Sequence, residues 1–226
     1  MIPASLPDSE PDPEYPVWDR FVRSAHWYLP VAIAVMWWSG EAGRMDIHQW
    51  VGLSLLCVVT VRLLWGFVGS EAARFTHFLA PPPLVWRYVR GGGQYAGHNP
   101  LGGWAVLAML LLLFIQSVSG LFSQDDLLFE GPLSYWAGER SGMLTEWHLI
   151  NWQVLQALVG VHLLAVAWYQ WWRNQPLIQA MWRGKAGHKA SATPPQPLWI
   201  AMVLMLITAL ALWGLLAIAP QAPSYY

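Results

Sequence analysis

Five long apolar segments constrain this chain more than any other feature. They run over about Trp18–Gly40, Ile47–Val68, Pro100–Phe122, Glu146–Trp172 and Leu198–Ile218. A helix needs roughly 20 apolar residues to cross the ~30 Å hydrocarbon layer of a membrane, and each segment has that length. Strands of a membrane β-barrel would be about ten residues long, with alternating polarity. The continuous segments therefore predict an all-α membrane protein.

The composition agrees with this prediction. Of the 226 residues, 56% are hydrophobic and 11% are charged, whereas a soluble domain carries about 25% charged residues. The 17 tryptophans are typical of a protein that meets the membrane–water boundary. A formal net charge of −1 gives no general attraction to nucleic acid. Membrane lipid is thus an expected partner, and nucleic acid is not.

The apolar segments also predict how the chain is divided. Residues 1–15 are acidic and proline-rich and lack the pattern of a secretory signal, so we expect a disordered cytoplasmic tail. Residues 16–185 hold four predicted helices and form one transmembrane domain, which residues 186–197 link to a further helix at 198–219. The expected fold class is a four-helix transmembrane bundle that binds two haems, with a fifth, C-terminal transmembrane helix.

The basic residues predict the orientation in the membrane. With the N-terminus in the cytoplasm, ten Lys and Arg residues lie on the inner side and only Arg44 and Arg140 lie outside. Such an excess is typical of cytoplasmic loops, so we expect a multi-pass protein of the bacterial inner membrane with a cytoplasmic N-terminus. The inner residues are Arg20, Arg23, Arg62, Arg74, Arg87, Arg90, Arg173, Arg183, Lys185 and Lys189.

Four histidines fall inside the predicted helices, where ionisable residues are costly and usually functional. His148 and His162 are 14 residues apart on one helix. That spacing is almost four turns, so both face the same side, ~21 Å apart along the axis. Helix direction then pairs residues by depth: His48 with His148 near the outer surface, and His26 with His162 near the inner surface.

Two such pairs predict two haems. Haem iron accepts axial histidines, and bundle cores commonly hold cofactors. The sequence has no C-x-x-C-H run, which excludes covalent c-type attachment. A zinc site would instead gather its ligands around one ion. The alternative for any single histidine is an interfacial, hydrogen-bonded residue, but four at matched depths favour two b-type haems.

Four further residues are candidates for contact with the cofactors. Gly40 is 14 residues after His26, and Gly52 is one turn after His48. Both leave room for a porphyrin, although glycine is also frequent in membrane helix packing. The arginines at 62 and 23 are placed to bind haem propionates, because a guanidinium binds a carboxylate through two parallel hydrogen bonds. The alternative is snorkelling of these arginines to the inner headgroups.

Several stretches resemble the bacterial cytochrome b561 family, which includes the cytochrome b subunits of nickel–iron hydrogenases. They are WDRFVRSAHW, IHQWVGLSLL, VRLLWGFVGS, GHNPLGG and EWHLINWQVLQALVGVHLLAV. The resemblance covers about residues 15 to 185 and rests mainly on the four histidines. It implies a four-helix core with two b haems on these ligands. It also implies electron transfer between a quinone pool and an outer partner, either a c-type cytochrome or a hydrogenase.

Three functions remain open at the level of sequence. The leading hypothesis is an electron relay, in which Arg62 raises the potential of the inner haem and acidic outer loops dock a basic partner. The second is a stand-alone membrane oxidoreductase that acts on a small molecule at the outer haem, with quinone as co-substrate. The third is a colourless bundle without haem, used for packing or assembly.

Overall fold

A computed structural model describes residues 16–91, 100–124, 129–184 and 193–220. All of the secondary-structure elements in the described residues are helices. The predicted tail at 1–15 lies outside the described residues, as does most of the predicted linker at 186–197.

Five long helices account for most of the chain, and they fall where the apolar segments predicted them. They are α1 (Arg20–Glu41), α2 (Met45–Val68), α5 (Pro100–Phe122), α7 (Ser141–Ala167) and α9 (Leu198–Ile218). The fourth begins five residues before the predicted Glu146, and one π-helical turn, η3 (Trp168–Trp172), continues it to the predicted end.

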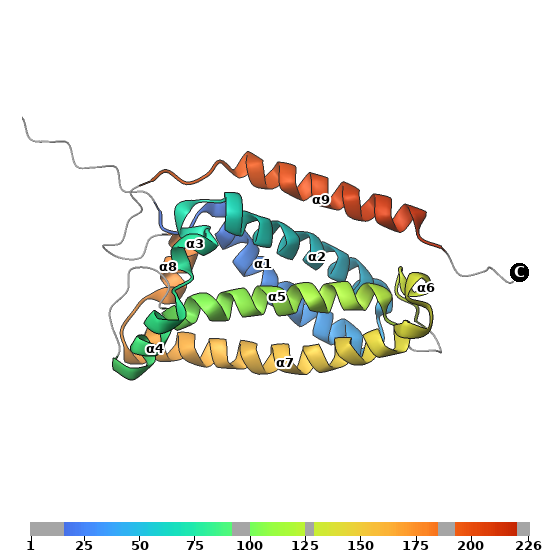
Figure 1. Ribbon diagram of the computed structural model, residues 1–226, viewed down its shortest axis with the longest axis horizontal. Coiled ribbons are helices and arrows are strands. Elements are labelled where there is room, and N and C mark those ends of the chain that lie inside the picture. Colours follow the sequence, from blue (N-terminus) through green and yellow to red (C-terminus); the bar gives the residue numbers. More distant parts are fainter. Residues whose placement is uncertain (1–15, 92–99, 125–128, 185–192, 221–226) are drawn as a thin grey trace, which may run out of the picture.

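Short helices that the hydropathy pattern does not reveal connect the long ones. They are η1 (Glu71–Ala73), α3 (Phe75–Phe78), α4 (Pro82–Gly91), α6 (Ser134–Ala137), η2 (Gly138–Arg140) and α8 (Leu177–Arg183). Figure 1 places α3, α4 and α8 at one end of the bundle and α6 at the other.

The helix ends have local causes. At the start of α1, the Asp19 carboxylate accepts a hydrogen bond from the Val22 N–H at 2.8 Å, which is a standard N-cap. Its second oxygen accepts from Nε1 of Trp65 on α2 at 2.8 Å. Gly43, with φ of +65°, makes the turn between α1 and α2, a conformation that glycine adopts without strain. These contacts fix α1 and α2 as an antiparallel hairpin.

The four helices α1, α2, α5 and α7 form a bundle, and α9 lies outside it (Figure 1). Neighbours in the bundle pack in the order α1–α2–α5–α7, while α9 packs mainly on α2. The central core joins Ala32, Val59, Leu113 and Leu155, one from each bundle helix. Ala201 of α9 packs into a second cluster with Val61 and neighbouring side chains.

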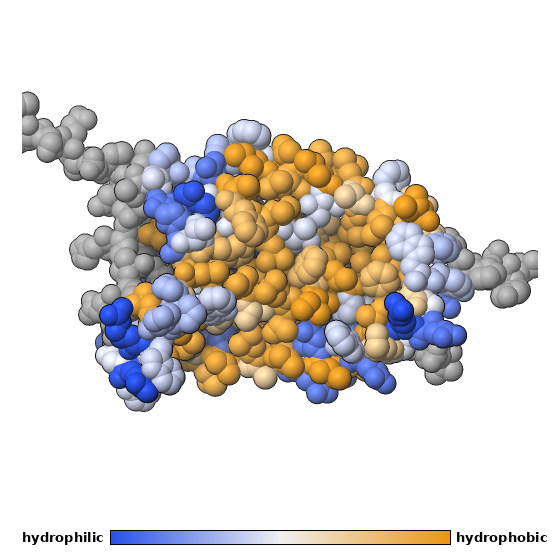
Figure 2. Space-filling model, in the orientation of Figure 1, coloured by the Kyte–Doolittle hydropathy of each residue, from blue (hydrophilic) through white to orange (hydrophobic). Residues whose placement is uncertain are grey.

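Four stretches are long and apolar enough to cross a membrane: Met45–Val68, Pro100–Phe122, Ser134–Trp172 and Leu198–Ile218. The sequence predicted five spans, but α1 is not among these four. It has 22 residues, yet its first half contains Arg20, Arg23 and His26, which lower its mean hydropathy. Figure 2 shows an apolar surface across the middle of the molecule with hydrophilic residues toward both ends, as a membrane-spanning bundle requires.

Candidate haem-binding sites

The structure brings His48 and His148 together at the α6 end of the bundle. Their ring centroids are 6.4 Å apart, and the ring planes are inclined by 68°. An imidazole nitrogen binds a metal ion such as zinc at about 2 Å, so two rings on opposite sides of one ion have centroids roughly 6 Å apart. The observed separation matches that arrangement. We call these residues the outer pair, after the orientation predicted from the sequence.

Backbone carbonyls fix the tautomer of both outer rings. Nδ1 of His48 lies 3.1 Å from the carbonyl oxygen of Met36 on α1. Nδ1 of His148 lies 3.0 Å from the carbonyl oxygen of Gln116 on α5. A carbonyl only accepts, so Nδ1 carries the proton in each ring and Nε2 keeps its lone pair. Histidines that bind metals show this arrangement, with the other ring nitrogen donating to a carbonyl.

A buried carboxamide contacts the remaining nitrogen of His148. Nε2 of Gln116 lies 3.0 Å from Nε2 of His148. Asn151 donates to Oε1 of Gln116 at 2.6 Å and to the Leu112 carbonyl oxygen. Because Asn151 binds the oxygen of this amide, its NH₂ group faces the histidine. An iron ion bound at this nitrogen would take the place of the amide donor.

Hydrogen bonds between the end of α5 and the start of α7 determine which residues of α5 lie beside His148. Ser141, at the start of α7, donates to the Phe122 carbonyl oxygen at 2.6 Å. Thr145 both donates to the carbonyl oxygen of Gln124 and accepts from its N–H, at 3.0 Å in each case. These bonds tie the end of α5 to the first turn of α7, so the relative register of the two helices is fixed.

The predicted glycines lie beside the outer pair, but each contacts protein. A Cβ on Gly40 would be 3.5 Å from the His48 ring, and one on Gly52 would be 3.3 Å from Cε of Met36. Gly120 on α5, which the sequence analysis missed, is closer still: a Cβ there would be 3.0 Å from Cε1 of His148. Gly40 and Gly120 therefore give the two outer rings room against the helix backbones.

The second pair, His26 on α1 and His162 on α7, lies toward the other end of the bundle. We call it the inner pair. The two rings are close enough to interact electrostatically, although α1 and α7 are not sequential neighbours in the bundle. In the part of the chain that the structure describes, the buried Nδ1 of His26 has no hydrogen-bond partner. A buried polar atom of this kind calls for an explanation, and an incoming group can supply the missing partner.

Arg62 is buried at the same end of the bundle as the inner pair, with 6% of its surface exposed. Its Nη1 has no hydrogen-bond partner among the described residues. The nearby carboxylate of Asp19 interacts with it electrostatically, but that carboxylate already accepts bonds from the Val22 N–H and Trp65. This burial does not fit snorkelling to headgroups. It fits a guanidinium that faces an anion inside the bundle.

Arg23 has a different set of partners. Its Nε donates to the carbonyl oxygen of Met181 at 3.3 Å, and its Nη2 donates to that of Trp182. Both carbonyls belong to the last turn of α8, where a cation is favourable. Arg23 thus joins α1 to α8, and its predicted contact with a propionate would have to use the remaining nitrogen.

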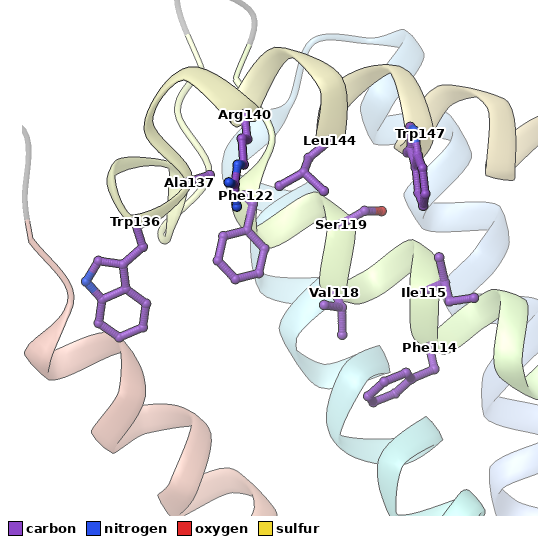
Figure 3. Close-up of a pocket in the computed structure, with 10 residues that line it drawn as sticks. All are labelled: Phe114, Ile115, Val118, Ser119, Phe122, Trp136, Ala137, Arg140, Leu144 and Trp147. Carbon is purple, nitrogen blue, oxygen red and sulfur yellow. The ribbon is translucent and has the colours of Figure 1, made fainter.

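An apolar cavity of about 500 Å³ lies beside the outer pair, between α5, α6 and the start of α7 (Figure 3). Ser119 lines it and also lies 3.1 Å from Nδ1 of His148. Arg140 adds a charge at the η2 end. The other lining residues are Phe114, Ile115, Val118, Phe122, Trp136, Ala137, Leu144 and Trp147. A mostly apolar site with a few polar groups is typical of small-molecule binding.

The donor set fits haem. His48 and His148 face each other with Nε2 unprotonated, and iron bound at Nε2 of His148 would displace the Gln116 amide. His26 and His162 lie close enough to interact electrostatically, and the buried guanidinium of Arg62 at the same end of the bundle matches the carboxylates that a haem carries. The fold and these histidines define a class of protein: a helical membrane protein with side chains suited to hold a flat, metal-centred cofactor between its helices.

Comparison with known proteins assigns the family. Residues 17–184 match the model of the prokaryotic cytochrome b561 family, so the chain belongs to that family, as the resemblance predicted. A related protein is the probable Ni/Fe-hydrogenase 1 B-type cytochrome subunit of Escherichia coli (strain K12). It is 23% identical over 217 residues, which cover 76% of this chain and 91% of that protein. The subunit with the same description in Escherichia coli O157:H7 gives the same values. No solved structure matches the chain.

Proposed function

We propose that this chain is a di-haem b-type cytochrome that transfers electrons across the bacterial inner membrane. One observation carries the proposal. The ring centroids of His48 and His148 are 6.4 Å apart, and Nδ1 of each ring is hydrogen-bonded to a backbone carbonyl. His26 and His162 provide the second set of ligands. The haem iron supplies one-electron chemistry when bound, with a potential set by its ligands and surroundings.

The protein's own residues place, orient and tune these groups. The carbonyls of Met36 and Gln116 hold the outer rings in the tautomer that leaves Nε2 unprotonated. Arg62 is buried at the end of the bundle that holds the inner pair. Its positive charge would favour the reduced form of a nearby metal centre, and its guanidinium could bind a propionate through two parallel hydrogen bonds. Gly40 provides space beside the His48 ring. Gly52 and Arg23 stay secondary candidates for cofactor contact.

In this proposal the chain has a cytoplasmic N-terminus and five spans. The hairpin of α1 with α2 inserts as a unit, and α9 forms an additional span beside the di-haem domain of residues 16–185. Electrons pass between a quinone pool and an outer partner. We favour a hydrogenase as that partner, because the E. coli relative is described as a hydrogenase cytochrome subunit. A c-type cytochrome is the alternative partner.

A second candidate function has its own support. The cavity beside Ser119 and His148 has the volume and lining of a small-molecule site, and it lies at the outer pair. It favours a stand-alone oxidoreductase in which a small molecule exchanges electrons at the outer haem and quinone completes the cycle. This alternative uses the same four histidine ligands.

The purified protein tests these proposals in two steps. A reduced-minus-oxidised spectrum with haem quantitation should show b-type haem at two per chain, and a colourless protein would contradict both functions. Oxidation or reduction of the haems by small molecules, without any partner protein, would then favour the stand-alone oxidoreductase. Electron transfer only with an added hydrogenase or c-type cytochrome would favour the relay.

A further inference from the structure

The outer histidines are held by the same arrangement of residues on two different helices. On α1, Nδ1 of His48 faces the Met36 carbonyl oxygen at 3.1 Å and Oγ of Ser39 at 3.3 Å. The next residue is Gly40, whose missing Cβ leaves 3.5 Å to the ring. Ser39 is fully buried. Carbonyl, serine and glycine thus surround one edge of the His48 ring.

The same three groups recur on α5. Nδ1 of His148 faces the Gln116 carbonyl oxygen at 3.0 Å and Oγ of Ser119 at 3.1 Å. Gly120 follows, and a Cβ there would be 3.0 Å from the ring. In each case the serine is three residues after the carbonyl and the glycine four, so all three lie on one face of the helix.

The serine hydroxyls have a defined role in both places. Oγ of Ser39 donates to the Met36 carbonyl oxygen at 3.1 Å, and Oγ of Ser119 donates to that of Gln116 at 3.1 Å. Their protons are therefore engaged, and their lone pairs are left to accept from the histidine. Each Nδ1–H is shared between a carbonyl and a hydroxyl, which restrains both the tautomer and the rotation of the ring.

The inner pair has no comparable arrangement among the described residues. The buried Nδ1 of His26 is without a hydrogen-bond partner there. Arg62, with 6% of its surface exposed, is buried at the same end of the bundle, where its neighbours Val61 and Trp65 pack on the start of α1. The two pairs therefore differ in the two factors that tune a ligated metal: hydrogen bonding to the ligands, and local charge.

We propose that Ser39 and Ser119 are positioning residues of the outer haem, which fix both histidine rings and lower its reduction potential below that of the inner haem. The proposal rests on the proposed haem ligation. Acceptors at Nδ1–H make an imidazole a more basic ligand, and a more basic ligand favours oxidised iron. The lower potential at the outer haem makes electron transfer toward the inner haem downhill.

Redox titration of the purified holoprotein tests this proposal. Ser39→Ala and Ser119→Ala should each raise the potential of the outer haem and leave that of the inner haem unchanged. Together they should change the ratio of reduced to oxidised outer haem about tenfold at fixed potential, which is about 59 mV for one electron. Low-spin electron paramagnetic resonance should show altered g values for the same haem, because the rings are freer to rotate.

Ser117→Ala is the matched control. Oγ of Ser117 donates to the Leu113 carbonyl oxygen at 2.9 Å, so this variant removes a similar hydroxyl from α5 with no contact to His148. It should change neither potential. If the double variant loses the outer haem, the potential of that haem is measured in the two single variants, because each of them keeps one serine.

Two results would overturn the inference. One is a pair of serine variants that leave the outer potential and g values unchanged. The other is a shift of the inner haem equal to that of the outer haem. Both require a protein that contains two haems, so they leave the proposed function standing. A protein without haem would instead overturn the proposed function before the serine variants were made.

Discussion

The outer and inner histidine pairs place the same side chains in two different settings. The outer rings are bound at Nδ1 by carbonyls and hydroxyls from the neighbouring helices α1 and α5. The inner pair joins α1 to α7, its His26 Nδ1 is unpartnered among the described residues, and Arg62 is buried at the same end of the bundle. The outer rings are thus held in place by the bundle itself, whereas Nδ1 of His26 is left for a partner that the described residues do not supply.

The largest expected effect comes from removing one ligand at a time. His148→Ala should eliminate the outer haem and His162→Ala the inner one, so haem content should fall from two to one per chain in each. Redox titration should then show different remaining potentials, lower in His162→Ala and higher in His148→Ala. If the two variants kept the same haem species, the division into two pairs would be wrong.

The next effect distinguishes the two glycines of the outer site. A Cβ at Gly120 would approach His148 to 3.0 Å, which forces the ring to move, whereas one at Gly40 would meet His48 at an ordinary 3.5 Å. Gly120→Ala should therefore reduce the outer haem content or change its g values, and Gly40→Ala should do neither.

Gly160→Ala on α7 is the control for these variants, since a Cβ there meets nothing within 4 Å. If Gly40→Ala and Gly120→Ala reduced the outer haem content equally, the space beside the two rings would not determine haem binding. The haem content per chain and the paramagnetic resonance spectrum are the measurements.

A smaller effect is expected at the inner site. Arg62→Gln removes a buried positive charge, so the reduced inner haem loses stabilisation and its potential should fall. A tenfold change in the ratio of reduced to oxidised inner haem, about 59 mV, is the expected size, with a smaller change for Arg62→Lys. A rise in potential, or a shift confined to the outer haem, would contradict the placement of Arg62.

The smallest effect is expected from Arg23→Gln. This variant removes the bonds from Arg23 to the carbonyls at the end of α8, and a hydrogen bond to a partly buried carbonyl contributes about 1 kcal/mol. Thermal unfolding in detergent should show a modest loss of stability, while both haem potentials stay unchanged. A clear shift of the inner potential would instead place Arg23 at a propionate.

Much of this arrangement could be predicted from the sequence, because the length of the apolar segments and the helical periodicity of the histidines determine it. Apolar length located the five long helices, and Asn99-Pro100 marked the start of α5, where the described helix begins. The 14-residue spacing of His148 and His162 placed them on one face at two depths. Helix direction then predicted their partners, and the structure places His48 beside His148.

What could not be predicted depends on how each helix is rotated in the bundle. Gln116, Ser119 and Gly120 contact His148 because of the angle between α5 and α7, which no single-helix pattern reveals. The repeated Ser-Gly pair was a signal that could have been found, since it occurs near the ends of α1 and α5, the two bundle helices that run in the same direction. The repetition is hard to see in the sequence because the segments that join each serine to its histidine differ in length. Ser39 precedes His48 by 9 residues, and Ser119 precedes His148 by 29.

The polar first half of α1 has a consequence for how the chain enters a membrane. During synthesis α1 emerges before α2, yet it is not among the helices that are apolar enough to cross alone. The translocation machinery favours apolar segments, and the polar residues in the first half of α1 lower its tendency to insert alone. Because α2 follows after a three-residue turn and packs along α1, we expect the pair to leave the translocon together. The segment that carries His26 and Ser39 would then reach its depth only as half of a hairpin.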